Sequence, residues 1–409
     1  MRTTTDHPNR LSRTARTTAV AVAFAALLAP VTTTSATAAA PPAAGAGAGA
    51  AARTGAGQHT ATQQALQAVV EEGLPGVAAE AWTGKERWFG EAGYADTSTY
   101  RKRSRADHFR AASITKVFIA TVLLQLQQER RLDLDDTVDA WLPGVVRGNG
   151  NDGRKIRLRQ LLNHTSGLSN YTDDPEFARR AAGPGFAEHR YDTYRPEDLV
   201  ALAMKSPPRD TPGAAHYSNT NYILAGMVIE KATGHSYAYE AERRIVRPLG
   251  LRETTFPGLR AAMPRPHPVG YSRLHSKEPN APIVDATEQN MSWLGAAGEV
   301  ISTTGDLNTL FHALLRGRLL APEAMREMLT TVHSEEDGFD YGLGVESVTL
   351  SCGVRIYGKT GRTNGSLSGL AATKDAKHQL AFNINGDWPK NAATYVGVVD
   401  AEFCATRTP

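Results

Sequence analysis

The chain has 409 residues and a formal net charge of +3, from 45 Lys and Arg against 42 Asp and Glu. Four Arg and one Asp lie within residues 1–40, so the rest of the chain carries 41 basic and 41 acidic residues and no net charge. This balance gives no electrostatic reason to expect a nucleic-acid partner or binding to a membrane surface.

Residues 1–40 are predicted to be an export signal (a signal peptide), and residues 41–58 a flexible linker. Arginines precede a short apolar run at 19–28, and small residues allow cleavage after Ala38 or Ala40. The run has about ten residues, whereas spanning a bilayer takes about twenty; an uncleaved anchor is the alternative. The linker is almost entirely Ala, Gly and Pro, which cannot form a packed core. We therefore expect a secreted, extracellular protein without membrane contact after cleavage.

Residues 59–409 are predicted to form a single domain of about 350 residues. A helix is expected from Thr60 to Glu71 or Glu72, and a hairpin of two strands follows it. A helix that begins near Ser113 is apolar on most sides, which predicts that it is buried. The hairpin strands are expected at 77–82 and 87–94, further helices at 156–163, 196–204 and 221–233, strands at 341–350, 354–358, 367–373 and 379–385, and a last helix at 394–403. Strands at both ends predict an α/β lobe made from both termini, with a mainly helical lobe inserted at about 125–290.

Ser113 and Lys116 form the first candidate catalytic element. A spacing of three on a helix places the two side chains on one face, one turn apart. A serine hydroxyl is a weak nucleophile, and a desolvated lysine beside it can act as its base. The alternative is a helix cap followed by an exposed lysine. Against this alternative, Lys116 lies in an otherwise apolar helix, where a charge needs a specific role.

Two further elements follow along the chain. Tyr217 and Asn219 precede a predicted helix, and a phenol near two ammonium groups can ionise below its usual pKa of about 10 and take the serine proton. Asn219 would donate to a substrate amide and hold Lys116. Lys359-Thr360-Gly361 follows an apolar strand, and the glycine allows a substrate to approach the backbone. A strand-end turn with a surface lysine is the alternative.

The three elements in this order are more specific than any one of them. They resemble the motifs of the penicillin-recognising serine hydrolases, and the Tyr-x-Asn form resembles the class C β-lactamases and the Streptomyces-type D-alanyl-D-alanine carboxypeptidases. The segments 157–168 (RLRQLLNHTSGL) and 293–301, Pro212-Gly213 and Asp306 carry the same resemblance, which extends over nearly the whole chain from about residue 60.

The resemblance implies a β-lactamase/transpeptidase-like fold of the α/β (α+β) class, with a mainly antiparallel sheet flanked by helices. It implies that Ser113 forms an acyl-enzyme while Tyr217, with Lys116, moves the proton to the leaving amine. The oxyanion would be held by the backbone N–H groups of Ser113 and Arg362. The substrate-binding residues would be Asn219, Trp293 as a wall of the cleft, Lys359, Thr360, Gly361 and Arg362. No metal or cofactor is needed.

The sequence departs from those carboxypeptidases where the terminal carboxylate of the substrate would bind. Lys359 stands at the position of their His, and Arg362 at the position of their Thr. Their carboxylate-binding arginine, about a dozen residues upstream, is replaced in that register by Glu346, which would repel a carboxylate. Two possibilities stay open: Arg362 binds the carboxylate, or Glu346 pairs with Arg362 and the anchor is weak.

The two cysteines, Cys352 and Cys404, are expected to form a disulfide in an exported protein, with two free thiols as the alternative. Their placement also resembles the Streptomyces carboxypeptidases. Two cysteines are too few for a structural zinc site, and His275, His312 and His333 are scattered along the chain. We therefore expect no metal.

The predicted function is that of a penicillin-binding DD-carboxypeptidase acting on D-alanyl-D-alanine-type peptides. Three alternatives stay open: a class C-like β-lactamase, an esterase or D-amino-acid amidase or peptidase of the same fold, and a receptor that is acylated without turnover. The expected partners are a small peptide or β-lactam substrate and peptidoglycan. We expect a monomer.

Overall fold

The computed structural model describes residues 59–405, except 85, 277, 279, 336–337 and 391–392. The predictions for residues 1–40 and 41–58 lie outside this part of the chain. Among the described helices, none combines the length and the apolar character that a bilayer span requires.

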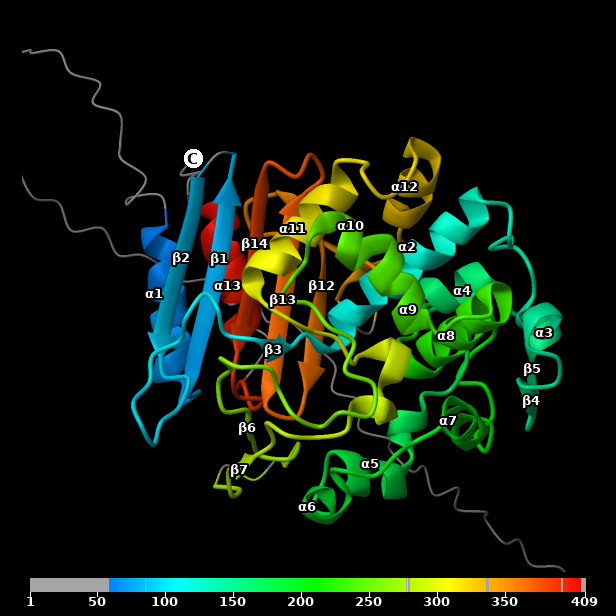
Figure 1. Ribbon diagram of the computed structural model, residues 1–409, viewed down its shortest axis with the longest axis horizontal. Coiled ribbons are helices and arrows are strands. Elements are labelled where there is room, and N and C mark those ends of the chain that lie inside the picture. The colour runs from blue at the N-terminus through cyan, green and yellow to red at the C-terminus, as the bar shows by residue number, and fades with distance from the viewer. Residues whose placement is uncertain are drawn as a thin grey trace, which may run out of the picture. The chain divides into compact units, whose positions relative to one another are not determined.

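An eight-stranded sheet runs in the order β2-β1-β14-β13-β12-β11-β10-β9 (Figure 1). Every neighbouring pair in it is antiparallel. The strands are β1 (Gly76–Thr83), β2 (Glu86–Gly93), β9 (Val332–His333), β10 (Asp340–Tyr341), β11 (Glu346–Thr349), β12 (Arg355–Thr363), β13 (Ser366–Thr373) and β14 (His378–Ile384). The sheet therefore combines both ends of the described chain, as predicted.

The single strand predicted at 341–350 is wrong, because the chain turns between β10 and β11. The N–H of Gly342 donates to the carbonyl of Val345 at 2.9 Å, which closes the turn. Gly344 has φ +79°, and a Cβ at this position would lie 2.8 Å from the carbonyl oxygen of Lys116. Only glycine suits both the left-handed backbone and this close approach. The turn separates two short strands and sets where β11 begins.

Helices cover both faces of the sheet. In Figure 1, α1 (Thr60–Glu71) and α13 (Ala393–Cys404) lie behind it and α11 (Thr304–Leu315) lies in front. Alternate residues of β14, Leu380 and Phe382 among them, pack into a hydrophobic cluster with α1 and α13, whereas Ala381 between them belongs to the cluster on the other face. This alternation is the two-residue period of a strand buried on both sides.

The front cluster continues into a mainly helical region. It contains α2 (Thr115–Gln128), which is buried on almost every side, as the apolar pattern predicted. The other helices are α3 (Val138–Trp141), α4 (Leu158–Leu162), α5 (Pro175–Ala181), α6 (Phe186–His189), α7 (Pro196–Ala203), α8 (Asn219–Thr233), α9 (Tyr237–Ala241), α10 (Arg247–Leu249) and α12 (Pro322–Leu329). Two-residue strands pair as β3 (Phe109–Arg110) with β8 (Ile301–Ser302), β4 (Arg147–Gly148) with β5 (Asn151–Asp152) and β6 (Tyr271–Ser272) with β7 (Val284–Asp285).

A buried polar cluster joins the beginning of the described chain to its last helix. Glu402 of α13 accepts from Thr62 at 2.7 Å and contacts His59 Nδ1 at 3.0 Å and His378 Nε2 at 2.6 Å. Burial alone would raise the pKa of Glu402, but hydrogen bonds from His378, His59 and Thr62 outweigh burial and lower it. The cluster therefore holds α1, α13 and β14 together while this carboxylate stays charged.

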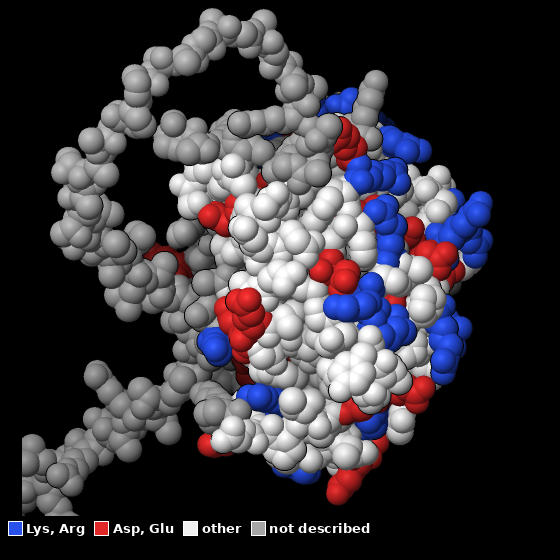
Figure 2. All heavy atoms as spheres, turned by 90° about the vertical axis from the view of Figure 1, so that its left-hand side faces the viewer, with Lys and Arg blue, Asp and Glu red and all other residues white. Residues whose placement is uncertain are grey.

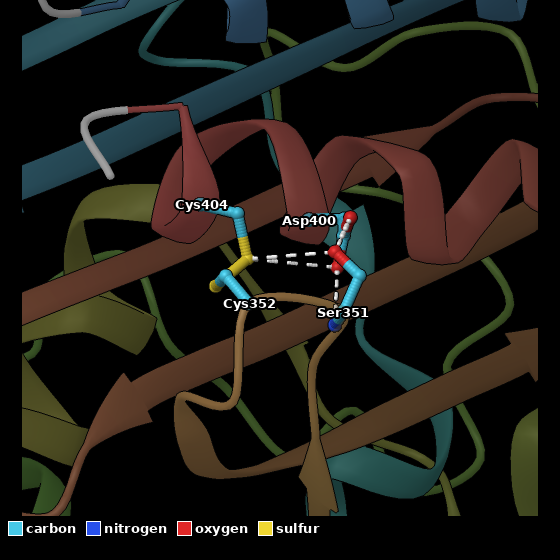
Figure 3. Close-up of a disulfide and its surroundings, with 4 residues drawn as sticks. All are labelled: Ser351, Cys352, Asp400 and Cys404. Carbon is cyan, nitrogen blue, oxygen red and sulfur yellow. Dashed lines mark hydrogen bonds between the residues drawn. A yellow bond between two sulfur atoms is a disulfide. The ribbon is translucent and has the colours of Figure 1, made fainter. Parts of the chain in front are cut away.

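The disulfide predicted between Cys352 and Cys404 is present and ties the β11–β12 turn to α13 (Figure 3). Asp400 lies beside it, and the N–H of Ser351 donates to Asp400 at 3.2 Å. This covalent link fixes the hairpin that carries β12, so it bears indirectly on the position of the β12 edge.

Acidic and basic side chains are interspersed on the face that carries β2 and α1 (Figure 2). Two of the basic groups there lie over aromatic rings, Arg87 over Trp82 at 4.0 Å and Arg105 over Phe89 at 5.3 Å. The mixture of signs agrees with the absence of net charge beyond residue 40.

Candidate active site

Ser113 lies in a short 3-10 turn, Ala112–Ile114, immediately before α2. The residue before it, Ala112, has φ +49°, a left-handed backbone that a non-glycine residue adopts at a cost. Thr115 stabilises the turn by donating to the carbonyl of Ala112 at 2.7 Å. The strained turn presents Ser113 at the end of a rigid, buried helix, which suits a nucleophile held in one orientation.

Lys116 lies one turn after Ser113, as the spacing predicted, and is fully buried. Its Nζ lies 2.8 Å from Asn219 Oδ1, 2.6 Å from the carbonyl oxygen of Ala297 and 3.1 Å from Ser113 Oγ. Burial lowers the pKa of Lys116 well below its usual 10.5, the charge of Lys359 lowers it further, and Glu346 opposes this. Burial therefore shifts Lys116 toward its uncharged amine form.

Lys116 Nζ has three oxygen partners, and two of them, Asn219 Oδ1 and the Ala297 carbonyl, only accept. Lys116 therefore donates to these two oxygens in either protonation state. In the uncharged form the remaining direction on Nζ, toward Ser113 Oγ at 3.1 Å, holds the lone pair. The amine form is thus placed to accept the serine proton directly.

Tyr217 approaches Ser113 from the segment before α8. Its Oη donates to Ser113 Oγ at 2.7 Å, and its ring lies 4.9 Å from Lys116 Nζ and 5.2 Å from Lys359 Nζ. The structure thus brings the three predicted catalytic residues together. The phenol is at hydrogen-bond distance from the serine oxygen, where it can exchange a proton with groups that react there.

The edge of β12 faces the nucleophile. Gly361 lies against the turn that carries Ser113, because a Cβ on it would lie 2.2 Å from the Ala111 carbonyl oxygen. The backbone N–H of Thr360 points toward β11, since it donates to Glu346 Oε2 at 2.9 Å. By strand alternation, the N–H of Arg362 points the same way. This orientation agrees with the predicted oxyanion hole of Ser113 and Arg362.

Glu346 occupies the groups on β12 that were expected to bind a carboxylate. It is 5% exposed and forms an ion pair with Lys359, which is 3% exposed. Its carboxylate also accepts from the N–H of Thr360 at 2.9 Å and from Thr360 Oγ1 at 3.3 Å. The possibility that Glu346 pairs with Arg362 is wrong, because the register of β11 against β12 places Glu346 opposite Gly358, beside Lys359 and Thr360.

Two predicted substrate-binding side chains have other contacts. The guanidinium of Arg362 donates to the carbonyl oxygen of Asp387 at 2.9 Å. Trp293 is only 9% exposed and packs against Phe177 with ring centroids 6.2 Å apart, so it lies in the core rather than forming a wall of an open cleft. It belongs to the segment that supplies the Ala297 carbonyl to Lys116, so its contribution to the site is indirect.

The sequence did not single out three groups that support this site: His164, Asn170 and the Ala297 carbonyl. Asn170 Oδ1 accepts from the N–H of Asn219 at 3.1 Å, and the ring of His164 lies 4.3 Å from that of Tyr217. The motif of segment 157–168 contains His164 and could have indicated it. Within the described ranges, no group of three His, Cys, Asp or Glu side chains is arranged to hold a metal ion.

Comparison with known proteins agrees with this geometry. The family model described as Beta-lactamase matches residues 33–401. The "Putative D-alanyl-D-alanine carboxypeptidase" of Escherichia coli (strain K12) is 28% identical over 287 residues, 62% of this chain and 63% of that protein. The chain spans little more than half the length of the first curated relatives that it matches.

Two solved structures resemble the chain over most of its length. A D-stereospecific amidohydrolase from Streptomyces sp. is 52% identical with a TM-score of 0.80, over 85% of this chain and 99% of the other. The D-amino acid amidase from Ochrobactrum anthropi SV3, complexed with D-phenylalanine, is 25% identical with a TM-score of 0.73, over 86% of this chain and 100% of the other.

Proposed function

The chain belongs to the beta-lactamase family and is a serine hydrolase by fold, and on this premise we propose that it hydrolyses amides or esters of D-amino acids without needing a carboxylate on the substrate. Glu346 carries this proposal, because it neutralises Lys359 and occupies the backbone and hydroxyl donors of Thr360. A substrate carboxylate at this edge of β12 would meet a carboxylate instead of a free ammonium.

The D configuration is supported by the relatives. The solved structure with 52% identity is named a D-stereospecific amidohydrolase, and this chain covers 99% of it. The 25% identical structure is named a D-amino acid amidase and was determined with D-phenylalanine. A substrate with a D-configured acyl group and an amide or ester leaving group fits both names.

The proposed reaction is acyl transfer through Ser113. Lys116 takes the hydroxyl proton as Oγ attacks the carbonyl carbon, and the N–H groups of Ser113 and Arg362 stabilise the oxyanion. The tetrahedral intermediate then collapses, the C–N bond breaks (C–O in an ester), and the leaving group takes a proton from Tyr217 Oη. The resulting phenolate regains a proton from the ammonium of Lys116, whose Nζ lies 4.9 Å from the Tyr217 ring. Water attacks the acyl-enzyme by the reverse proton path and releases the acid.

A DD-carboxypeptidase is the second candidate, because curated relatives of 27–28% identity have that name. It requires Lys359 or Arg362 to bind a terminal carboxylate despite Glu346. We further propose that the enzyme acts outside the cell, because residues 1–40 have the sequence of an export signal and disulfides persist in oxidising compartments.

The substrate class is tested by measuring kcat/KM for D- and L-phenylalanine amide, for an acyl-D-alanyl-D-alanine peptide and its C-terminal amide, and for nitrocefin. We expect turnover of the D-amide at least about tenfold above the L-amide, and no preference for the free carboxylate. Ser113→Ala is the control and must abolish all turnover. A strict need for the free carboxylate favours the carboxypeptidase, and rapid nitrocefin hydrolysis favours a β-lactamase; either result overturns the proposal.

A further inference from the structure

The chain around Tyr217 is anchored on both sides by one residue, His164. The N–H of His216 donates to the His164 carbonyl oxygen at 2.9 Å, and the N–H of Ser218 donates to His164 Nδ1 at 3.3 Å. Between these two bonds, the His164 ring packs on the Tyr217 ring with centroids 4.3 Å apart and an interplanar angle of 34°. His164 therefore contacts the backbone before and after Tyr217 and the side chain itself.

These contacts define the state of the imidazole. A backbone N–H can only donate, so Nδ1 accepts from Ser218 and carries no proton. Asn221 Nδ2 also lies 3.3 Å from Nδ1, while Asn221 Oδ1 accepts from Ser166 Oγ at 2.6 Å, which orients the amide with its nitrogen toward the ring. The ring is therefore neutral, with its proton on Nε2.

The surroundings keep the ring neutral. His164 is 2% exposed, and burial, followed by the neighbouring lysines Lys116 and Lys359, lowers its pKa well below the usual 6.5. Tyr222 and Tyr341 also pack against the ring, at centroid distances of 5.4 and 5.1 Å. A charged imidazole would lose the acceptor that holds Ser218 and would add a cation beside the site.

The backbone of His164 explains why few residues suit this position. Its φ is +59°, in the left-handed region that glycine and asparagine enter most readily. Asparagine also has an acceptor, Oδ1, bonded to Cγ as Nδ1 is in histidine. Asparagine can therefore replace the backbone anchor without replacing the ring.

We propose that His164 is a positioning residue of this enzyme: its neutral imidazole and its carbonyl fix residues 216–218 so that Tyr217 Oη stays on Ser113 Oγ. This positioning role affects the acylation of Ser113. It rests on the proposed function only in that the enzyme works by acyl transfer. Removing the anchor lets the phenol move away from the serine oxygen, and such misplacement lowers the rate of reaction while leaving substrate binding intact.

The test compares His164→Ala, His164→Phe and His164→Asn by steady-state kinetics. We expect His164→Ala to lower kcat about a hundredfold with KM within about threefold of the parent, because proton transfer is impaired and binding is not. His164→Asn should recover at least about tenfold of that loss. His164→Phe, which has a ring but no acceptor, should not. A proportional rise in KM, or an Asn variant no better than Ala, overturns the proposal.

A double-mutant cycle and a matched control separate positioning from general damage to the fold. If His164 acts through Tyr217, His164→Ala lowers kcat by less than about twofold in a Tyr217→Phe background; a full additive loss contradicts the proposal. His59→Ala is the control, because His59 is also buried, stacks on Trp88 at 4.9 Å and contacts Glu402, yet lies on the far face of the sheet. It should lower the melting temperature but not kcat.

The same variants are assayed by the burst of p-nitrophenol released from p-nitrophenyl acetate, which reports acylation of Ser113 whatever the natural substrate. Failure to hydrolyse D-aminoacyl amides would contradict the proposed function and leave this readout intact. A burst rate unchanged in His164→Ala would contradict the positioning role even if D-aminoacyl amides are hydrolysed.

Discussion

Replacing Glu346 by Gln tests directly why this site should not need a substrate carboxylate. Glutamine has nearly the same shape and can keep the bond from the Thr360 N–H, now 2.9 Å long. It removes the charge that pairs with Lys359, and it presents an amide N–H₂ or a neutral oxygen to the ammonium. Lys359 thereby loses its anionic partner inside the site and becomes available to an anionic group of a substrate.

The structure allows both consequences to be estimated. Both members of the pair are at least 95% buried, and removing one partner of such a pair costs about 3–5 kcal/mol of stability. A hydrogen bond between the freed ammonium and a substrate carboxylate contributes about 1.5–3 kcal/mol. This corresponds to a gain of roughly tenfold to a hundredfold in kcat/KM for a free-carboxylate peptide relative to its C-terminal amide.

The assay measures kcat/KM for an acyl-D-alanyl-D-alanine peptide and for its amide, in the parent and in Glu346→Gln, with the melting temperature of each. Glu240→Gln is the matched control. Glu240, on α9, is a carboxylate only 1% exposed that accepts from Arg243 at 2.8 Å and also from Arg244. The Glu240→Gln protein should lose a similar amount of stability, but its ratio of kcat/KM for the free-carboxylate peptide to kcat/KM for the amide should stay at the parental value. A Glu346→Gln protein that is folded but keeps the parental ratio would refute the reasoning.

Four other changes have defined outcomes. Ser113→Ala should abolish covalent labelling by penicillin with little change in melting temperature; labelling elsewhere would contradict the assignment. Tyr217→Phe should slow acylation about a hundredfold or more, and a loss under about tenfold would leave Lys116 sufficient alone. Cys352→Ser opens a loop whose ends are 52 residues apart, so unfolding free energy should fall by about 4 kcal/mol on the chain-entropy model. Glu402→Gln should destabilise at pH 7 but not in acid, because a carboxylate with a lowered pKa contributes stability above about pH 4.5 that is lost as pH falls through the folded-state pKa; urea titrations at both pH values measure it.

The parts of the site that depend on short spacing could be predicted from the sequence. Ser113 and Lys116 are one helical turn apart, so any helix at this position brings them together. Tyr217 and Asn219 are two positions apart, so they also lie close together in any fold. Their contact with Ser113 and Lys116 depends on the tertiary structure. Helices α1, α2, α4, α7, α8 and α13 and most strands of the main sheet were also predicted, because their apolar periodicity is local, whereas α11 and α12 were not.

The partner of Glu346 was missed although the sequence indicates the register. The strands predicted at 341–350 and 354–358 leave a turn centred on Cys352, from which Glu346 and Gly358 are equally distant. This pairing places Glu346 beside Lys359 and Thr360, whereas Arg362 lies four residues further along β12. Gly342 and Gly344 mark the turn between β10 and β11 that a single strand at 341–350 leaves out.

His164 illustrates a different limit. Its partners, residues 216–221, lie more than fifty positions away, and no periodicity links the two segments. The contact arises because α4 and α8 pack side by side in the helical region, which only the tertiary structure specifies. The left-handed φ of His164 and its place beside residues 216–218 both arise from the folded chain and cannot be predicted from the local sequence.

The two lysines of the site acquire opposite roles from their partners alone. Lys116 contacts only neutral groups, the oxygens of Asn219, Ala297 and Ser113, so burial favours its uncharged form and leaves a base beside the nucleophile. Lys359 contacts a carboxylate, so its charge is balanced within the protein. A substrate carboxylate would therefore compete with Glu346 for Lys359, while Arg362 already donates to the carbonyl oxygen of Asp387. On the proposed function, substrate selectivity then depends on the acyl group rather than on a terminal carboxylate.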